Sequence, residues 1–222
     1  MVGLLALMTM GTTPGMLFLA GGGNTPDAIA DRFIAAAGGP EARIVVLGQT
    51  RENPERAQAS ADFLKERGAK NVELYAAAKI SREELGRIRK EWANVAGFWV
   101  PGGDQALFMD RFPARWSRPY FQGKIREGAV WFGTSAGAMI TSDTMIEYSD
   151  DDGKPVLRQG LGLTGVLVDT HYRERNRQAR MRDAFSRIPS APRAVGIEAK
   201  EWIVISGDVV VEDHGAAEVI ER

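Results

Sequence analysis

A serine flanked by glycines is the residue best placed to do chemistry in this chain. Gly133–Gly137 has the pattern G-x-S-x-G, and it separates an apolar run, Ala129–Phe132, from a run that is compatible with a helix. In a nucleophile elbow this arrangement puts the serine on a sharp strand-to-helix turn, with its hydroxyl exposed. The flanking glycines omit side chains that would collide there. We therefore interpret Ser135 as a nucleophile rather than as the cap of an ordinary turn.

An acyl-transfer site also needs donors that bind the oxyanion. The N–H of Ala136 lies at the expected start of the helix. Gly102 and Gly103 follow another apolar run, Val95–Val100, and either one is a candidate for the second donor. Gln105 comes two residues later and is a candidate to hydrogen-bond the substrate. These groups are expected to meet at the carboxyl edge of the sheet, where open α/β sheets bind ligands.

A serine nucleophile requires a general base, and the chain has two histidines. His171 follows the apolar run Gly165–Val168, which is expected to deliver it to the sheet edge. His214 lies in Asp213–Gly215, an expected exposed hairpin tip. We therefore favour His171 as the base.

The acid that orients the imidazole is less determined by the sequence. Glu198 follows the short apolar run Ala194–Ile197, whereas Glu201 and Asp169 are alternatives. With Glu198 the chain order is serine, histidine, acid. The α/β-hydrolases have serine, acid, histidine, so the order argues for a different fold.

The surrounding pattern predicts a single α/β domain over residues 1–222, with a mostly parallel sheet flanked by helices. Asp104 and Thr25 are expected helix caps, Pro26 an expected first helical residue, and 150–153 an expected turn. Antiparallel hairpins at 206–208 and 213–215 are expected to close one edge of the sheet. The predicted strands are Met16–Ala20, Arg43–Leu47, Val72–Tyr75, Val95–Val100, Ala129–Phe132, Ile203–Ile205 and Val209–Val211, and the predicted helices are Pro54–Arg67, Ser81–Trp92, Ala136–Thr144 and Arg173–Arg187.

Composition excludes several classes of protein. The 222 residues contain no cysteine, which removes disulfide frameworks, thiolate nucleophiles and cysteine-bound metals. The formal charge of -1 provides no electrostatic footprint for nucleic acid. Gly21–Gly23 resembles a dinucleotide loop, but Pro26 stands where the last glycine of the fingerprint belongs. No cofactor and no metal are expected, since Asp150–Asp152 lacks ligand spacing with either histidine.

The first ten residues are apolar but lack a preceding basic residue and a cleavage site. We expect residues 1–10 to form a packed N-terminal segment and the protein to be cytoplasmic, with a secreted form as the alternative. No run approaches the ~20 apolar residues of a membrane-spanning helix, so no membrane association is expected.

Three motifs together resemble the cyanophycinase and dipeptidase E family of serine peptidases. These are Phe132–Ala138, the Gly102–Gln105 loop, and Asp169–Tyr172 followed by spaced arginines. The resemblance extends from Leu17 to Glu198. It implies a flavodoxin-like α/β fold related to the class I glutamine amidotransferases, and cleavage of bonds next to aspartate. It also suggests a homodimer.

The resemblance implies roles for individual residues. Ser135 would be the nucleophile, His171 the base and Glu198 the orienting acid. The residues that would line the substrate pocket are Gln105, Asp169, Thr170, Arg175, Arg177 and Arg180. Cyanophycinases typically have glutamine where this chain has Thr170, which weakens the case for the polymer as substrate.

The arginines after His171 also make sense without the resemblance. Arg173, Arg177 and Arg180 are spaced four and three apart, so they would share one face of a helix. A guanidinium binds a carboxylate through two parallel hydrogen bonds, which suits an aspartyl substrate. The alternative is a solvated basic face paired with Glu174 and Asp183.

The expected substrate is an aspartyl peptide or an Asp/Arg polymer with β-Asp-Arg linkages. The arginine pattern favours the cyanophycinase-like substrate. The alternatives are N-terminal Asp-X dipeptides, or a catalytically silent relative that binds an acidic peptide.

Overall fold

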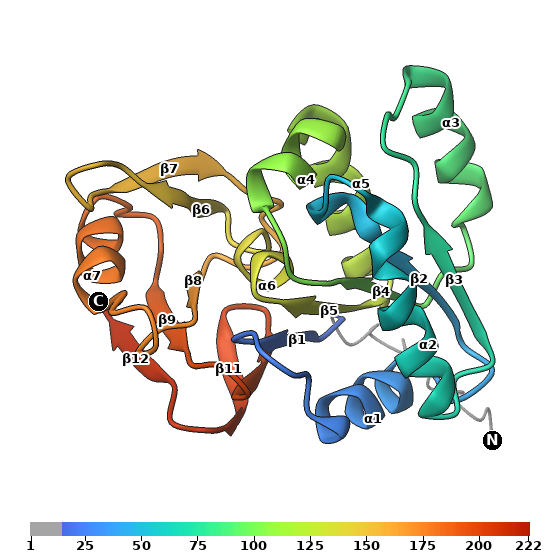
Figure 1. The fold of residues 1–222 in the computed structure, drawn as a ribbon, viewed down its shortest axis with the longest axis horizontal. Helices are drawn as coiled ribbons and strands as arrows, with labels where there is room; N and C mark the ends of the chain where they lie inside the picture. The colour runs from blue at the N-terminus through green and yellow to red at the C-terminus, as the bar shows by residue number, and fades with distance from the viewer. Residues whose placement is uncertain (1–14) are drawn as a thin grey trace, which may run out of the picture.

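A seven-stranded sheet runs through the computed structural model, which describes residues 15–222 (Figure 1). The strand order is β11-β10-β1-β5-β4-β2-β3. The five strands from β1 to β3 in this order are parallel, and β10 and β11 are antiparallel additions at one edge. The strands of this sheet are β1 (Leu17–Ala20), β2 (Arg43–Leu47), β3 (Asn71–Tyr75), β4 (Gly97–Val100), β5 (Val130–Thr134), β10 (Trp202–Ser206) and β11 (Val209–His214).

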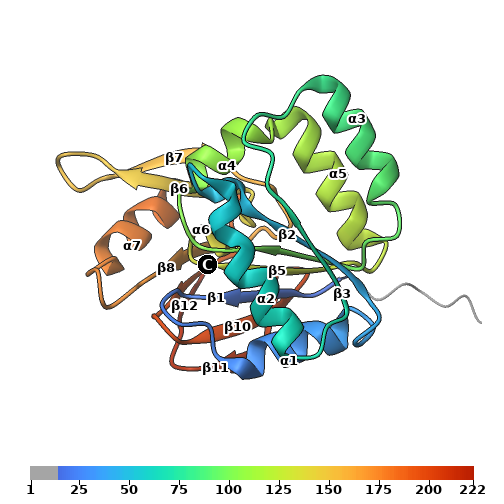
Figure 2. The same cartoon turned by 45° about the vertical axis from the view of Figure 1, so that its right-hand side comes forward.

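Helices cover both faces of the sheet, with α1 and α2 on one face and α3 and α5 on the other (Figure 2). The buried strand side chains alternate between these faces, as the pleat requires. Phe18 packs on the α1–α2 side, whereas Leu17 and Leu19 pack on the other side. The helices are α1 (Asp27–Ala36), α2 (Gln58–Glu66), α3 (Arg82–Glu91), α4 (Gln105–Arg111), α5 (Ala114–Arg126), α6 (Ala136–Met139) and α7 (Gln178–Ser186).

Two smaller sheets lie beside the main one (Figure 1). β8 (Leu167–Thr170), β9 (Arg193–Ile197) and β12 (Glu218–Glu221) form a three-stranded sheet, and β6 (Thr144–Ser149) pairs with β7 (Pro155–Gln159). The predicted fold class, a mostly parallel sheet flanked by helices with antiparallel additions, is confirmed. The predicted hairpin at 206–208 is also confirmed. The hairpin at 213–215 is wrong, because β12 pairs with β9 and not with β11.

Several predicted boundaries differ from the structure. Pro26 is the N-cap of α1, one residue later than the cap predicted at Thr25. The segment 54–57 is a 3-10 turn that precedes α2. α6 ends at Met139, and not near residue 144, because the carbonyls of Ile140 and Thr141 accept from the N–H groups of Leu161 and Leu163 instead of continuing the helix.

The predicted helix Arg173–Arg187 exists only from Gln178 onward. Asn176 has a φ of 52°, in the left-handed region that interrupts a helix, and the N–H of Arg177 bonds the carbonyl of Tyr172. Residues 171–177 therefore form an irregular turn, and the expected single face of arginines does not form.

The expectation for residues 1–10 lies outside the described residues. Within residues 15–222, none of the helices has the length and apolar character needed to span a bilayer.

Candidate active site

Ser135 occupies a strained position between β5 and α6. Its φ of 53° and ψ of -111° are sparsely populated, as expected of an elbow that aims its side chain outward. A side-chain carbon at Gly133 would lie 2.2 Å from the carbonyl oxygen of Gly137, and one at Gly137 would lie 1.8 Å from that of Val100. Only glycine fits at these two positions, so the motif is a packing requirement of the turn.

His171 follows β8 and faces the serine. Its Nε2 lies 3.0 Å from Oγ of Ser135, and its φ of 50° is also left-handed. Burial lowers the pKa of His171 below its usual 6.5, and the positive charge of Arg175 lowers it further, against the opposing effect of Glu174. The imidazole is therefore neutral near pH 7 and able to accept the serine proton.

The end of β1 holds both of these residues by their backbones. The carbonyl of Ala20 accepts from the N–H of Ser135 at 2.9 Å, and the carbonyl of Gly21 accepts from the N–H of His171 at 3.0 Å. Two adjacent carbonyls thus set the separation between two loops that are 36 residues apart in sequence. Because both loops have unfavourable backbone angles, these bonds offset part of the strain.

Glycines let the β1 loop approach this closely. A side-chain carbon at Gly22 would lie 2.3 Å from Nε2 of His171, and one at Gly21 would lie 2.0 Å from the carbonyl oxygen of Glu198. The carbonyl of Gly22 also accepts from the N–H of Lys200 at 2.8 Å. The run Gly21–Gly23, which does not match the dinucleotide-binding fingerprint, therefore packs against His171, the candidate base.

The carboxylate beside the imidazole is Glu174. Its Oε1 lies 3.3 Å from Nδ1 of His171, and in residues 15–222 no other carboxylate oxygen lies within 4 Å of a ring nitrogen of His171. Glu198, the acid that we predicted, instead accepts from the N–H groups of Arg173, Glu174 and Ala199. The direct contact predicted between Glu198 and the base is therefore absent from this arrangement, and Glu198 positions the backbone of Glu174.

The pKa of Glu198 shows the balance of these contacts. Burial raises it, but the hydrogen bonds from the N–H groups of Ala199, Glu174 and Arg173 outweigh burial, so the pKa lies below 4.5. The other two predicted candidates for the acid are occupied elsewhere. Glu201 pairs with Arg173 at 2.5 Å, and Asp169 is fully buried.

Two of the three predicted oxyanion donors, Ala136 and Gly102, lie at the elbow, whereas Gly103 packs against Thr50. A side-chain carbon at Gly102 would be 3.4 Å from Cβ of Ser135, which places this loop directly beside the nucleophile. Within residues 15–222, the N–H groups of Gly102, Gly103 and Ala136 have no hydrogen-bond acceptor. Asp104 caps α4 as predicted, since its Oδ1 accepts from the first helical N–H groups.

Four residues predicted to bind substrate are arranged differently. Asp169 and Thr170 are completely buried, and Arg180 is nearly so. Arg180 donates through two nitrogens to Asp169, and Arg177 donates to the carbonyl of Thr170 at 2.9 Å. This buried ion cluster supports the end of β8, two residues before His171. In this structure the carboxylate of Asp169 pairs with the guanidinium groups of Arg177 and Arg180, and the substrate-binding role of these four residues stays a prediction.

Two other predicted pocket residues have partners at or near the surface. Nε2 of Gln105 donates to the carbonyls of Ile146 and Glu147, which ties α4 to β6. Arg175 is half exposed, with Nε 3.8 Å from Glu174. The positive charges of Arg175 and Arg177 both lower the pKa of His171, and Arg175 has the larger effect.

His214 does not contact the serine. It is the last residue of β11, and its ring stacks on Trp202 with centroids 3.6 Å apart, while its Nε2 lies 3.0 Å from Glu212. The prediction of an exposed hairpin tip is therefore wrong in detail, although His171 remains the histidine at the serine. Residues 15–222 hold no cluster of three or more side chains suited to a metal ion.

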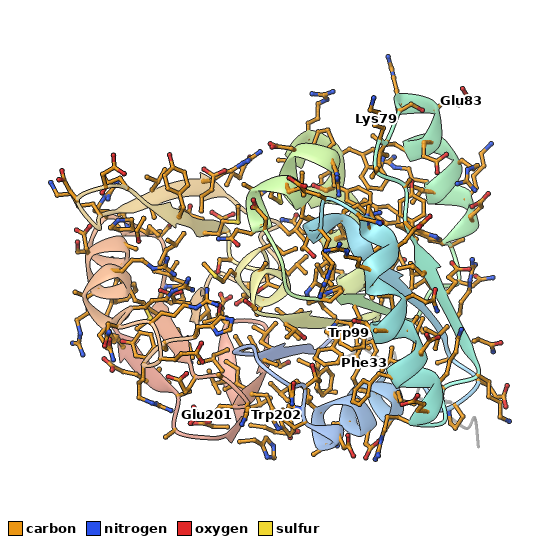
Figure 3. The ribbon with its side chains drawn as sticks, in the orientation of Figure 1. Phe33, Lys79, Glu83, Trp99, Glu201 and Trp202 are labelled. Carbon is orange, nitrogen blue, oxygen red and sulfur yellow. The ribbon has the colours of Figure 1, made fainter. Side chains whose placement is uncertain are left out.

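A cavity of about 510 Å³ opens beside the elbow. Gly102 and Thr134 form the side next to Ser135, and the apolar wall consists of Phe63 and Trp99. Trp99 belongs to the α1–α2 side of the sheet (Figure 3). Sequence reasoning missed this cavity and its one arginine, Arg51, although Arg51 comes shortly after β2 at the same edge of the sheet. It also missed Glu174, whose spacing of three residues from His171 was a usable signal.

The fold and the site together define an α/β protein in which a serine on a nucleophile elbow faces a histidine that follows another strand. Residues 17–212 match the profile of peptidase family S51. The chain therefore belongs to peptidase family S51.

Similar proteins point to the same family. The chain is 28% identical over 202 residues to a cyanophycinase of Synechococcus elongatus, covering 86% of this chain and 62% of that protein. It is 26% identical over 199 residues to a cyanophycinase of Geminocystis herdmanii, covering 86% and 73%. The chain thus spans about three fifths of the length of the Synechococcus relative.

Solved structures share the fold at lower identity. A peptidase from an acI-B1 Actinobacterium superposes with a TM-score of 0.63 and 19% identity, over 96% of this chain and 98% of that one. A putative peptidase E of Listeria monocytogenes has a TM-score of 0.60 and 17% identity, over 94% and 98%. At these identities the likeness concerns the fold alone.

Proposed function

We propose that this protein is a serine peptidase that hydrolyses peptide or isopeptide bonds next to aspartate through an acyl-enzyme. The observation that carries the proposal is the 3.0 Å separation between Oγ of Ser135 and Nε2 of His171 on a nucleophile elbow. A serine alone is a weak nucleophile at neutral pH, and a neutral imidazole at hydrogen-bond distance is what activates it.

In the proposed first step, Oγ of Ser135 attacks the scissile carbonyl while its proton passes to Nε2 of His171. The negative charge that develops on the carbonyl oxygen is bound by the N–H of Ala136 and by that of Gly102 or Gly103. The imidazolium then protonates the leaving amine. Water, deprotonated by the same imidazole, hydrolyses the acyl-enzyme and restores Ser135.

In this proposal two carboxylates share the role of the orienting acid. Glu174 accepts a hydrogen bond from Nδ1–H of His171, which selects the tautomer whose Nε2 is free to accept the serine proton. Glu198 holds the N–H of Glu174 at 2.9 Å and so keeps that carboxylate in reach. The triad predicted as serine, histidine and Glu198 becomes a chain of contacts in which Glu198 acts through Glu174.

The relatives named cyanophycinase make β-Asp-Arg linkages the first substrate to test. The cavity favours a second candidate, N-terminal Asp-X dipeptides. Its lining contains one arginine and no acidic side chain, so it offers no partner for the guanidinium of a substrate arginine. A neutral or anionic residue suits this lining better.

The test incubates the protein with cyanophycin, β-Asp-Arg and Asp-X dipeptides and follows the products, with Ser135→Ala as the control. We expect cleavage of at least one of these substrates, and a loss in the variant of about 10⁴-fold or more in kcat. Cleavage that persists in Ser135→Ala would contradict the mechanism. Inactivity on all of the substrates, with the variant equally silent, would contradict the proposed bond class.

A further inference from the structure

The cavity beside Ser135 contains a charged group without a counter-charge. Arg51 lines this cavity, and in residues 15–222 its guanidinium has no carboxylate within 4 Å. Its Nε is buried and has no hydrogen-bond partner. A guanidinium that lines a cavity and has no carboxylate partner can bind an anionic group that enters, because hydrogen bonds between two charged groups are stronger than those between neutral ones.

The walls of the cavity suit an apolar body attached to that anion. The ring of Trp99 is fixed, because it stacks on Phe132 at 4.5 Å and its Nε1 donates to Thr134 at 3.2 Å. Phe63 meets Trp99 edge to face, with centroids 6.1 Å apart. The volume of about 510 Å³ lies within the range of small-ligand pockets. The cavity thus combines a preformed aromatic wall with one cation.

The position of the cavity indicates which part of a substrate it takes. The leaving nitrogen must lie beside Nε2 of His171, which protonates it. Gly22 packs against Nε2 of His171, and the next two residues, Gly23 and Asn24, line the cavity. The cavity therefore continues from the leaving-group side of the scissile bond.

The loop that carries Arg51 is held rigidly and is joined to the candidate oxyanion loop. Arg111 of α4 donates to the carbonyls of Gln49, Arg51 and Glu52. Thr50 bonds the carbonyl of Pro101 through its hydroxyl at 3.0 Å, and its own carbonyl accepts from the N–H of Asp104 at 2.7 Å. These bonds fix the backbone from which the Arg51 side chain extends, next to the candidate oxyanion loop.

We propose that this cavity binds the leaving residue of the substrate, with its free α-carboxylate on Arg51 and its apolar side chain against Phe63 and Trp99. The inference rests on the proposed peptidase function and specifies its leaving group. It makes the enzyme selective for substrates that end one residue after the scissile bond, since an amide or a longer chain lacks the anion at this point.

The test measures binding separately from turnover. The Ser135→Ala protein is titrated with Asp-Leu and with Asp-Leu amide, which differ only in the C-terminal charge. We expect the acid to bind about 10- to 100-fold more tightly, and Arg51→Met in the same background to remove most of the difference. Arg51→Lys should retain part of it. Arg56→Met is the matched control, an exposed arginine outside the lining.

Equal binding of acid and amide, no binding of either, or equal losses in Arg51→Met and Arg56→Met would overturn the inference. The peptidase itself is judged by a separate result, the dependence of cleavage on Ser135. If binding depends on Arg51 but no aspartyl substrate is cleaved, the carboxylate subsite stands and the proposed reaction fails. If cleavage depends on Ser135 but acid and amide react alike, the proposed reaction stands and the carboxylate subsite fails.

Discussion

Gly22 lies so close to His171 that a side-chain carbon at this glycine would stand 2.3 Å from Nε2 and 2.4 Å from Cε1. No real carbon approaches a ring atom at that distance, so a larger residue must displace the imidazole. The displaced atom is the one that faces Oγ of Ser135 at 3.0 Å. The geometry of the candidate nucleophile–base pair thus depends on a residue that has no functional group.

We therefore expect Gly22→Ala to reduce kcat by about 100-fold, because misplacing a reacting group by about 1 Å costs that much. The substitution also strains the backbone, since Gly22 has a φ of 119°. Gly38→Ala is the matched control, with a φ of 112° and no atom closer than 3.9 Å to the added carbon. Both variants should lose similar stability in urea unfolding, and only Gly22→Ala should lose activity. Equal activities would show that the imidazole is not positioned this way.

The local parts of the site were predictable from the sequence. The spacing of Gly133, Ser135 and Gly137 marks the elbow, and the need for glycine at 133 arises within the motif, from the carbonyl of Gly137. The need for glycine at 137 arises from the carbonyl of Val100 on the neighbouring strand β4, which the spacing alone does not show. The choice of His171 followed from the presence of only two histidines and from the apolar run before it.

The parts that depend on distant contacts were not predictable. The turn after His171 has its shape because Glu198, 24 residues beyond Glu174, binds its N–H groups. The prediction from helical spacing therefore began the helix at Arg173 instead of Gln178, and it wrongly placed the arginines on one helix face. In the same way, nothing near Asp169 in the sequence shows that it is buried against Arg180.

Asp169→Asn should destabilise the protein by about 3–5 kcal/mol, since it leaves the buried Arg180 without its counter-charge. Urea unfolding at pH 7 measures this. The control is Glu41→Gln, at the exposed ion pair with Lys70, which should leave the urea midpoint nearly unchanged. Similar midpoints for the two variants would mean that the buried cluster contributes no more than a surface pair.

Glu198→Gln should cost about 1–3 kcal/mol at pH 7, because an amide replaces a carboxylate that accepts three backbone hydrogen bonds. The folded-state pKa of Glu198 lies below its usual 4.5, so the charge stabilises the fold fully above pH 4.5. This contribution is lost as the pH falls through the lower, folded-state pKa.

The difference in stability between the native protein and Glu198→Gln should therefore shrink as the pH is lowered from 4.5, as followed by urea unfolding at several pH values. A difference that stays constant down to pH 3, or that grows, would contradict the role assigned to this carboxylate.

The pH dependence of kcat/KM tests the two charges beside His171. Activity requires the neutral imidazole, so the acid limb of the profile reports the pKa of His171, which lies below 6.5. Arg175→Gln removes a cation and should move this limb to higher pH. Glu174→Gln removes an anion and should move it to lower pH, together with a lower plateau because the imidazole is less well oriented.

The shift caused by Arg175→Gln should shrink in high salt, since the Arg175 side chain is 52% exposed and its field is screened. Arg56→Gln, which removes an exposed cation outside the site, should leave the profile where it is. Shifts of the same sign in the Arg175 and Glu174 variants would show that neither charge acts on the imidazole directly. Opposite shifts would establish that His171 titrates between these two side chains, as the 3.3 Å contact to Glu174 requires.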